Sequence, residues 1–325
     1  MHPLETYEAF VIDLDGVCYL DGRLFEGVPE ALFKIESTGA RVVFVTNNSY
    51  RTPEAFAQML TAGPFKADPS QVLTSSAAAA RMMLQTLAER LSGKEGVTPL
   101  KPRVVAAGGK GVHDALRKVG IEPVAPEEWS DPEAPPGVVL GVDRNFNYQR
   151  LSLLSRFIRE GSEFIATNED PTYPTPSGLV PGAGAVVAAV EVASGRKARV
   201  AGKPHWPMVD LVSNQLGDAH ALVVGDRWDT DLAFAHRLGF DSALVLSGVA
   251  SLEDAVRSPY PPKLVAKSLP TLLDNPVLIL RGPKGDISAE GGDPEIARAV
   301  QAVLSRNSES NYGSRVDPDR SSRQR

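Results

Sequence analysis

The stretch Ala9-Phe10-Val11-Ile12-Asp13-Leu14-Asp15-Gly16 decides the fold. It opens with four apolar residues and stops abruptly at an aspartate. Apolar runs of this length are typical of strands buried on both faces of a parallel sheet. Three further runs end in the same way, before Thr46, before Gly202-Lys203 and before Gly225-Asp226, and another covers residues 243–246. The pattern predicts five buried strands.

Segments with helical patterns lie between these runs and end at glycine. They cover residues 28–38, 53–62, 206–216 and 229–238. Glycine just past the last turn is the usual left-handed terminator of a helix. Strands that alternate with helices predict an α/β fold, a doubly wound parallel sheet that forms a Rossmann-like core.

The middle of the chain interrupts this series with strand and helix patterns of its own. We therefore expect a core of residues 1–78 and 184–280, with residues 79–183 as an inserted, smaller α/β cap domain. The alternative is one large sheet with all strands in line. After the core, residues 281–325 are expected to form a Gly- and charge-rich linker up to residue 292, a short helix to Ser305 and a disordered tail.

Composition narrows the class of protein. The 325 residues include 34 Lys and Arg against 40 Asp and Glu, a net charge of −6, which argues against a nucleic-acid partner. No apolar stretch is long enough for a membrane span, and no signal peptide is recognisable. A single cysteine, Cys18, cannot form an intramolecular disulfide. These features predict a soluble, cytoplasmic protein.

The polar residues that end the strands carry the chemistry. In an open parallel sheet, ligands bind outside the carboxyl ends of the strands. The predicted strands bring several polar residues to that edge. Clustered carboxylates repel one another unless cations compensate, and oxygen ligands suit Mg²⁺, which shares its coordination with phosphate. The sequence predicts a Mg²⁺ and phosphate site built from Asp13, Asp15, Thr46, Asn47, Lys203, Asp226 and Asp231.

Each motif is weak when it stands alone. A D-x-D-G tetrapeptide arises by chance in about one chain in ten of this size. A calcium loop of the EF-hand type is excluded, because Asp13 and Asp15 are not followed by further acidic residues at the spacing that such a loop requires. The order and spacing of the motifs after strands carry the inference.

These motifs together resemble the haloacid dehalogenase superfamily of aspartate-nucleophile phosphatases. The resemblance rests on four segments, Phe10–Val17, Val45-Thr46-Asn47-Asn48-Ser49, Gly202-Lys203-Pro204 and Gly225–Asp231. The T-N-N-S version and an insert between the second and third motifs are similar to the NagD-like, para-nitrophenyl phosphatase branch. Within the insert, Gly141-Val142-Asp143, Ile165–Asp170 and Pro181-Gly182-Ala183-Gly184 look like cap signatures of that branch.

The resemblance implies a Mg²⁺-dependent phosphatase. Asp13 would be the nucleophile that forms an aspartyl-phosphate, and Asp15 the general acid and base. The metal would be held by Asp13, the Asp15 carbonyl and Asp226, with Asp231 behind them. The phosphate would be bound by Thr46, the Asn47 backbone N–H and Lys203.

The expected substrate is a small phosphorylated metabolite. In a capped enzyme the inserted domain selects the leaving group, and here Asn168, Glu169 and Asp170 are the candidate selectors. Polar selectors favour a sugar, glycerol or glycolate phosphate, although these acids could instead only cap a turn. A homodimer through the cap is expected from the resemblance alone.

Other interpretations stay open or fail on particular residues. A phosphotransferase or mutase could share the aspartyl-phosphate. A catalytically inactive phosphate-binding descendant would be expected to lose Asp15 or Lys203, and both are present. A receiver-like signalling module lacks the second aspartate and the insert. A dinucleotide oxidoreductase is disfavoured, because Gly182-Ala183-Gly184 does not complete G-x-G-x-x-G.

Two residues near the motifs are unusual. Trp228 is uncommon at its position in the branch, and Cys18 near the nucleophile is either an inert apolar residue or a site of oxidative inhibition.

Overall fold

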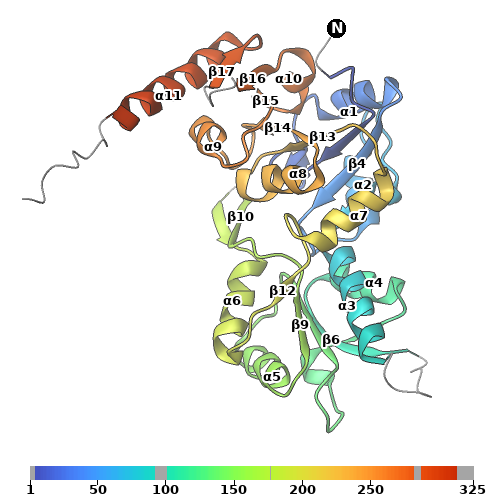
Figure 1. Ribbon diagram of the computed structural model, residues 1–325. Coiled ribbons are helices and arrows are strands. Elements are labelled where there is room, and N and C mark those ends of the chain that lie inside the picture. The colour runs from blue at the N-terminus through green and yellow to red at the C-terminus, as the bar shows by residue number, and fades with distance from the viewer. Residues whose placement is uncertain (1–3, 92–100, 176, 282–286, 313–325) are drawn as a thin grey trace, which may run out of the picture.

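The structure is a computed structural model that describes residues 4–91, 101–175, 177–281 and 287–312 (Figure 1). Its largest element is a sheet in the order β17-β16-β15-β14-β13-β1-β4-β5. The strands from β15 to β5 run parallel, and β16 and β17 are antiparallel additions. Their bounds are β1 Ala9–Ile12, β4 Arg41–Thr46, β5 Val72–Thr74, β13 Ala221–Gly225, β14 Asp241–Val245, β15 Leu264–Ala266, β16 Val277–Arg281 and β17 Ile287–Glu290.

Helices cover both faces of this sheet, which explains why its strands are almost wholly apolar. Alternate residues of β1 point to opposite faces. Phe10 and Ile12 pack in a cluster with α1 (Val28–Ser37), α2 (Pro53–Leu60) and α10 (Leu269–Asp274). Ala9 and Val11 pack in a second cluster with α3 (Ser75–Leu91), α7 (Trp206–Leu216) and α8 (Ala233–Leu238). The doubly wound α/β fold is confirmed.

A second parallel sheet, in the order β12-β9-β8-β6-β7, lies below the first in Figure 1. Helices α5 and α6 pack on one of its faces, and α3 and α4 pack on the other. The bounds are β6 Arg103–Ala107, α4 Lys110–Lys118, β7 Glu122–Val124, β8 Gly137–Leu140, α5 Tyr148–Arg159, β9 Glu163–Ala166, α6 Ala183–Ser194 and β12 Arg199–Val200. The strands therefore lie in two sheets, not in line in one.

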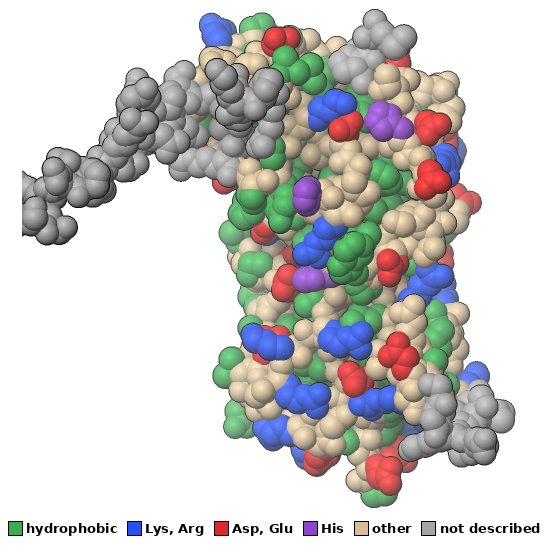
Figure 2. Space-filling model, in the orientation of Figure 1, with side chains coloured by type: hydrophobic (Ala, Val, Ile, Leu, Met, Phe, Trp, Pro, Cys, Tyr) green, Lys and Arg blue, Asp and Glu red, His purple; other side chains and the backbone are tan. Residues whose placement is uncertain are grey.

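The remaining elements are short or peripheral. The hairpins β2–β3 and β10–β11 form separate two-stranded sheets, and a π-helix precedes α8. Their bounds are β2 Tyr19–Leu20, β3 Arg23–Leu24, η1 Pro69–Gln71, η2 Pro126–Glu128, β10 Thr172–Thr175, β11 Gly178–Pro181, η3 Trp228–Leu232, α9 Leu252–Arg257 and α11 Pro294–Tyr312. On the face seen in Figure 2, acidic and basic side chains are interspersed over both parts of the molecule.

One predicted core strand lies in the other sheet. The run at residues 198–201 forms β12, which pairs with β9 at the edge of the second sheet. Helix α6 also packs with the second sheet, through Val187 and Val190. The run is polar at Arg199 and only two residues pair, so local sequence does not decide which sheet takes it. Helix α3 spans the expected boundary at residues 78 and 79 and packs against both sheets.

The C-terminal region is more structured than the sequence predicted. The expected linker contains β17, which extends the main sheet. The helix expected to stop at Ser305 continues as α11 to Tyr312, and the rest of the predicted tail lies outside the described residues. Ile296 and Val300 on α11 are buried in a cluster with residues of β14, β15 and β16. Within the described ranges, no helix is both long and apolar enough to span a membrane.

Candidate active site

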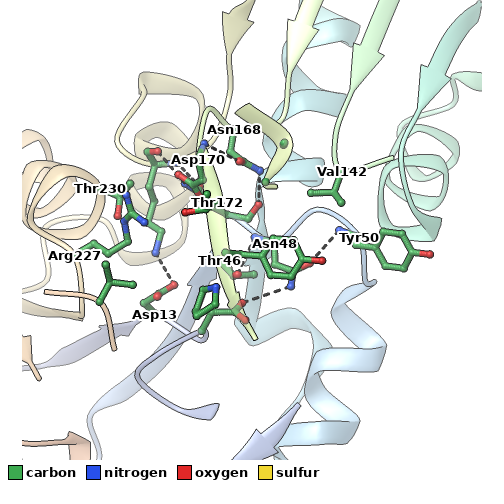
Figure 3. A pocket seen from close by; sticks show the side chains of 18 of the residues that line it. Asp13, Thr46, Asn48, Tyr50, Val142, Asn168, Asp170, Thr172, Arg227 and Thr230 are labelled. Atoms are coloured by element: carbon green, nitrogen blue, oxygen red, sulfur yellow. Dashed lines mark hydrogen bonds and ion pairs between the residues drawn. The ribbon is translucent and has the colours of Figure 1, made fainter. Parts of the chain in front are cut away.

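The site lies at the carboxyl ends of β13, β1 and β4, which are neighbours in the main sheet. Asp13 follows β1, Thr46 ends β4 and Asp226 follows β13. Lys203 joins them from the loop between β12 and α7. We call the second sheet, together with α4, α5, α6 and the β10–β11 hairpin, the second unit. Figure 3 shows Asp13, Thr46 and Asn48 on one side of a cavity, with Asn168, Asp170 and Thr172 from the second unit opposite. The convergence predicted at this sheet edge is therefore present.

Lys203 binds two buried carboxylates. Its Nζ lies 2.6 Å from Asp13 Oδ1 and 2.6 Å from Asp231 Oδ1. Burial alone would lower the pKa of Lys203, but the two carboxylates raise it above its ordinary value, so the lysine is cationic. Burial raises the pKa of Asp13, and Lys203 opposes this effect. One lysine does not balance the three acids Asp13, Asp226 and Asp231.

The acid cluster fits a metal ion. Oxygens of Asp13, Asp226 and Asp231 lie within 4.8 Å of one another. Asp226 Oδ2 accepts a hydrogen bond from Val249 N at 2.8 Å, whereas its buried Oδ1 has no partner among the described residues. Burial, and then Asp231, raise the pKa of Asp226 to about 7. A buried acceptor left open beside other carboxylates is what a hard cation such as Mg²⁺ would complete.

Two neighbouring features orient Asp226. Asp231 Oδ2 accepts the backbone N–H groups of Asp226, at 3.2 Å, and Arg227, at 3.1 Å. Gly16 has a φ of +85°, and a Cβ at this position would lie 2.5 Å from Asp226 Oδ2. Only glycine gives both this left-handed conformation and the space. Both carboxylate oxygens of Asp231 are thus engaged, so Asp231 supports the site from behind.

Asp15 lies two residues beyond Asp13 and also lines the cavity. Its Oδ2 accepts a hydrogen bond from the Tyr19 hydroxyl at 2.7 Å and a longer one from Asn48 Nδ2 at 3.5 Å. Burial raises the pKa of Asp15, and these two hydrogen bonds oppose the rise. A carboxyl with a raised pKa beside the cavity can donate a proton.

The turn after β4 is held by the second unit. Asn47 Oδ1 accepts Lys203 N at 2.8 Å, and Asn47 Nδ2 donates to Asp170 Oδ1 at 3.2 Å. The buried Asn168 donates from Nδ2 to Asn47 O at 2.7 Å. Thr167 Oγ1 donates to Ser49 Oγ at 3.0 Å. Asn168 is thus tied to the turn that carries Thr46 and Asn47.

The predicted substrate selectors divide between two environments. Asn168 and Asp170 line the cavity, and burial raises the pKa of Asp170 to about 6. Glu169 lies outside the cavity lining, with its side chain 57% exposed and its Oε1 2.8 Å from His205 Nε2.

Cys18 is fully buried, its Sγ donates to Asp13 O at 3.4 Å, and burial raises the pKa of its thiol. Trp228 is partly exposed and does not line the cavity.

The cavity has a volume of about 140 Å³ and is lined by both units. Its lining also contains side chains that the sequence did not single out. Arg144 Cζ of the second unit lies 4.5 Å from the ring centroid of Tyr50, which follows the β4 turn. Their only sequence signal is proximity to the T-N-N-S and G-V-D motifs. The missed lining residues include Tyr19, Asp21, Tyr50, Arg51, Arg144, Tyr173 and Arg227.

Comparison with known proteins places this geometry in a family. A model of haloacid dehalogenase-like hydrolases matches residues 10–122, and a related HAD-hydrolase-like model matches residues 200–272. Mouse chronophin is 35% identical over 253 residues, which cover 76% of this chain and 84% of chronophin. An acid sugar phosphatase of Staphylococcus aureus is 31% identical over 269 residues, 82% of this chain and 96% of that protein.

Solved structures agree with these matches. A glycerol phosphate phosphatase of Mycobacterium tuberculosis in complex with magnesium has a TM-score of 0.73 and 32% identity, over 93% of this chain and 90% of that one. A 4-nitrophenylphosphatase of Thermotoga maritima has a TM-score of 0.70 and 32% identity, over 84% of this chain and 98% of that one. Sequence and fold agree, and the chain belongs to the haloacid dehalogenase-like hydrolases, in the NagD-like branch.

Proposed function

We propose that this enzyme hydrolyses small phosphomonoesters in two steps, with Asp13 as the nucleophile. First, a carboxylate oxygen of Asp13 bonds to phosphorus, the bond from phosphorus to the ester oxygen breaks, and the Asp15 proton passes to that oxygen. Water then bonds to phosphorus and gives its proton to Asp15, and the bond from phosphorus to Asp13 breaks. The observation that carries the proposal is the convergence of Asp13, Asp15 and Lys203 on one cavity.

Mg²⁺ is the cofactor that fits the acid cluster. Asp13, Asp226 and the Asp15 carbonyl would hold it, and the ion would offset charge between nucleophile and phosphoryl group. The open Asp226 Oδ1 supports this assignment. Asp231 would fix the orientation of Asp226 and of Lys203 through the contacts that it already makes.

Three groups of this chain would hold the phosphoryl oxygens. We assign this role to Lys203, the Thr46 hydroxyl and the Asn47 backbone N–H. Donors held in place before reaction stabilise developing charge without reorganisation. The side chain of Asn47 is engaged with Lys203 and Asp170, so it would position the turn and not contact phosphate.

The second unit would act as a cap over the leaving group. This proposal keeps residues 1–78 and 184–280 as the core and residues 79–183 as the cap, although β12 and α6 also pack with the second sheet. Asp170, Arg144 and Tyr173 line the cavity; Asp170 and Tyr173 can bind hydroxyl groups, and Arg144 can bind a carboxylate. We propose a sugar, glycerol or glycolate phosphate as substrate. Relatives include an acid sugar phosphatase and a glycerol phosphate phosphatase.

The first test is hydrolysis of para-nitrophenyl phosphate by the wild type and by Asp13→Asn, with Mg²⁺ and with a chelator. We expect turnover only in the wild type with Mg²⁺. A panel of sugar, glycerol and glycolate phosphates then identifies the leaving group. If the folded wild type hydrolyses neither the aryl ester nor the panel, the hydrolase proposal is wrong, and a transferase or phosphate-binding protein remains.

Two further expectations stay predictions. The homodimer through the cap is consistent with Tyr148 on α5, which is 84% exposed. Analytical ultracentrifugation of the wild type and of Tyr148→Ser would test it. The cytoplasmic location rests only on the sequence pattern.

A further inference from the structure

We infer that Tyr19 is a positioning residue that assigns the acidic proton of Asp15 to one of its two oxygens. This inference rests on the proposed role of Asp15 as general acid. The Tyr19 hydroxyl lies 2.7 Å from Asp15 Oδ2, within ordinary range for a short O–H···O hydrogen bond.

The Tyr19 hydroxyl is held rigidly. Tyr19 is 3% exposed, and its ring stacks on Phe56 with the centroids 6.5 Å apart and the planes 23° apart. Its backbone is fixed as well, because Tyr19 N donates to Leu14 O at 3.2 Å and Tyr19 O accepts Gly16 N at 2.8 Å. The hydroxyl therefore belongs to the same folded loop as the carboxyl that it contacts.

The direction of this hydrogen bond is set by chemistry. The Tyr19 phenol carries a proton at neutral pH and donates a hydrogen bond to Asp15 Oδ2. Asn48 Nδ2 reaches the same oxygen at 3.5 Å. An oxygen that accepts hydrogen bonds from two donors is a poor place for a third proton. In the neutral carboxyl, the proton is therefore carried by Oδ1, the oxygen that Tyr19 leaves free.

This arrangement matters most when the leaving group needs a proton. An alkoxide leaves poorly and depends on the general acid, whereas para-nitrophenolate leaves readily without one. Removal of the Tyr19 hydroxyl lets Asp15 rotate and place its proton on either oxygen. The cost should therefore appear in the first step, release of the leaving group, with alkyl phosphates and be small in that step with the aryl phosphate, whereas the second step is common to both substrates.

The test compares Tyr19→Phe with the wild type on glycerol phosphate and on para-nitrophenyl phosphate in saturating Mg²⁺, and measures the single-turnover rate at which the leaving group is released. General acids contribute about 10²–10⁴ to rate, so partial loss of alignment should lower the release rate of glycerol by about tenfold or more. We expect less than about a threefold change for the aryl ester. The ratio of the two rates does not depend on the fraction of folded enzyme, so it remains informative if the variant is unstable.

The chain offers a matched control. Tyr7 is also buried, and its hydroxyl donates to an aspartate, Asp241 Oδ2, at 2.8 Å, but it does not line the cavity. Tyr7→Phe should leave the ratio unchanged. Asp15→Asn, which cannot donate an acidic proton, should shift it in the same direction as Tyr19→Phe and further.

The outcomes separate this inference from the proposed function. If Tyr19→Phe lowers both rates equally, changes only KM, or changes nothing, Tyr19 does not position the acid. If glycerol phosphate is not a substrate, the alkyl phosphate of the panel that is hydrolysed takes its place. If the wild type hydrolyses no phosphomonoester, the proposed function itself fails, and with it the role assigned to Tyr19.

Discussion

At the scale of single residues, the site is dominated by buried carboxylates. Asp13, Asp226 and Asp231 share one lysine, and the burial of each charge is costly unless it is paired. The excess negative charge means that a bound cation should stabilise the folded protein. Metal binding and folding stability are therefore linked at this site.

The Asp226→Asn variant should separate these two effects. Without Mg²⁺, we expect the variant to be at least as stable as the wild type, because a buried carboxylate that raises electrostatic repulsion is removed. With Mg²⁺ at 100 times its dissociation constant, the wild type should gain about 2.7 kcal/mol and the variant much less. Thermal melting with and without Mg²⁺ measures both. An equal gain in the two proteins would remove Asp226 from the metal site.

Asp170 should make stability depend on pH. Burial raises its pKa from 3.8 to about 6, so the folded protein binds this proton more tightly than the unfolded chain does. The resulting stabilisation is present at low pH and is lost as pH rises through 6. Asp170→Asn has no such term, so its melting temperature relative to the wild type should rise between pH 4.5 and 7. A constant difference across this range would contradict the raised pKa.

At the scale of elements, the loop after β9 supports the turn after β4. Asn168 and Thr167 donate to the backbone or side chain of that turn. The two loops come from different sheets, so the phosphate-binding turn takes its shape from the junction between them. Asn168, which we expected to select the substrate, therefore also positions the turn after β4.

Asn168→Ala should lower activity because the turn after β4 loses this hydrogen bond. The variant removes a donor to Asn47 O, which keeps Ser75 Oγ at 2.7 Å as its other partner. A lost hydrogen bond whose acceptor keeps another partner costs about 0.5–1.5 kcal/mol, and we expect kcat to fall about tenfold for aryl and alkyl phosphates alike. Steady-state kinetics checks this, with the exposed Asn214→Ala on α7 as control. Loss of activity toward only one class of substrate would instead favour direct contact with the leaving group.

At the scale of the whole molecule, the C-terminal elements complete the main sheet and lie far from the cavity. Helix α11 extends from the sheet end at the top left of Figure 1. It buries Ile296 and Val300 against residues of β14, β15 and β16. These elements are expected to contribute stability and not chemistry.

Ile296→Ala should therefore destabilise the protein and leave catalysis intact. Ile296 is 3% exposed, and removal of a buried isoleucine side chain costs about 2–5 kcal/mol. Denaturant unfolding measures the loss, and kcat below the melting range should match the wild type. Arg298→Ala, an exposed position on the same helix, serves as control. A fall in kcat at full occupancy of the folded state would show that the C-terminal elements reach the site.

The sequence by itself determined the α/β class, the main-sheet strands β1, β4, β13 and β14, and the convergence of Asp13, Thr46, Lys203 and Asp226. These follow from short-range patterns, because a buried parallel strand needs an apolar run and its carboxyl end places the next polar residue at the ligand edge.

Only the tertiary structure decided the pairing of β12 with β9, the addition of β17, and the contacts of Asn168 and Tyr19. Strand pairing depends on which sheet edge is free, and side-chain contacts depend on rotamers and on residues far apart in the chain. Neither is encoded in local periodicity. Glu169 shows the limit most clearly, since it is next to two cavity residues yet points outward to His205.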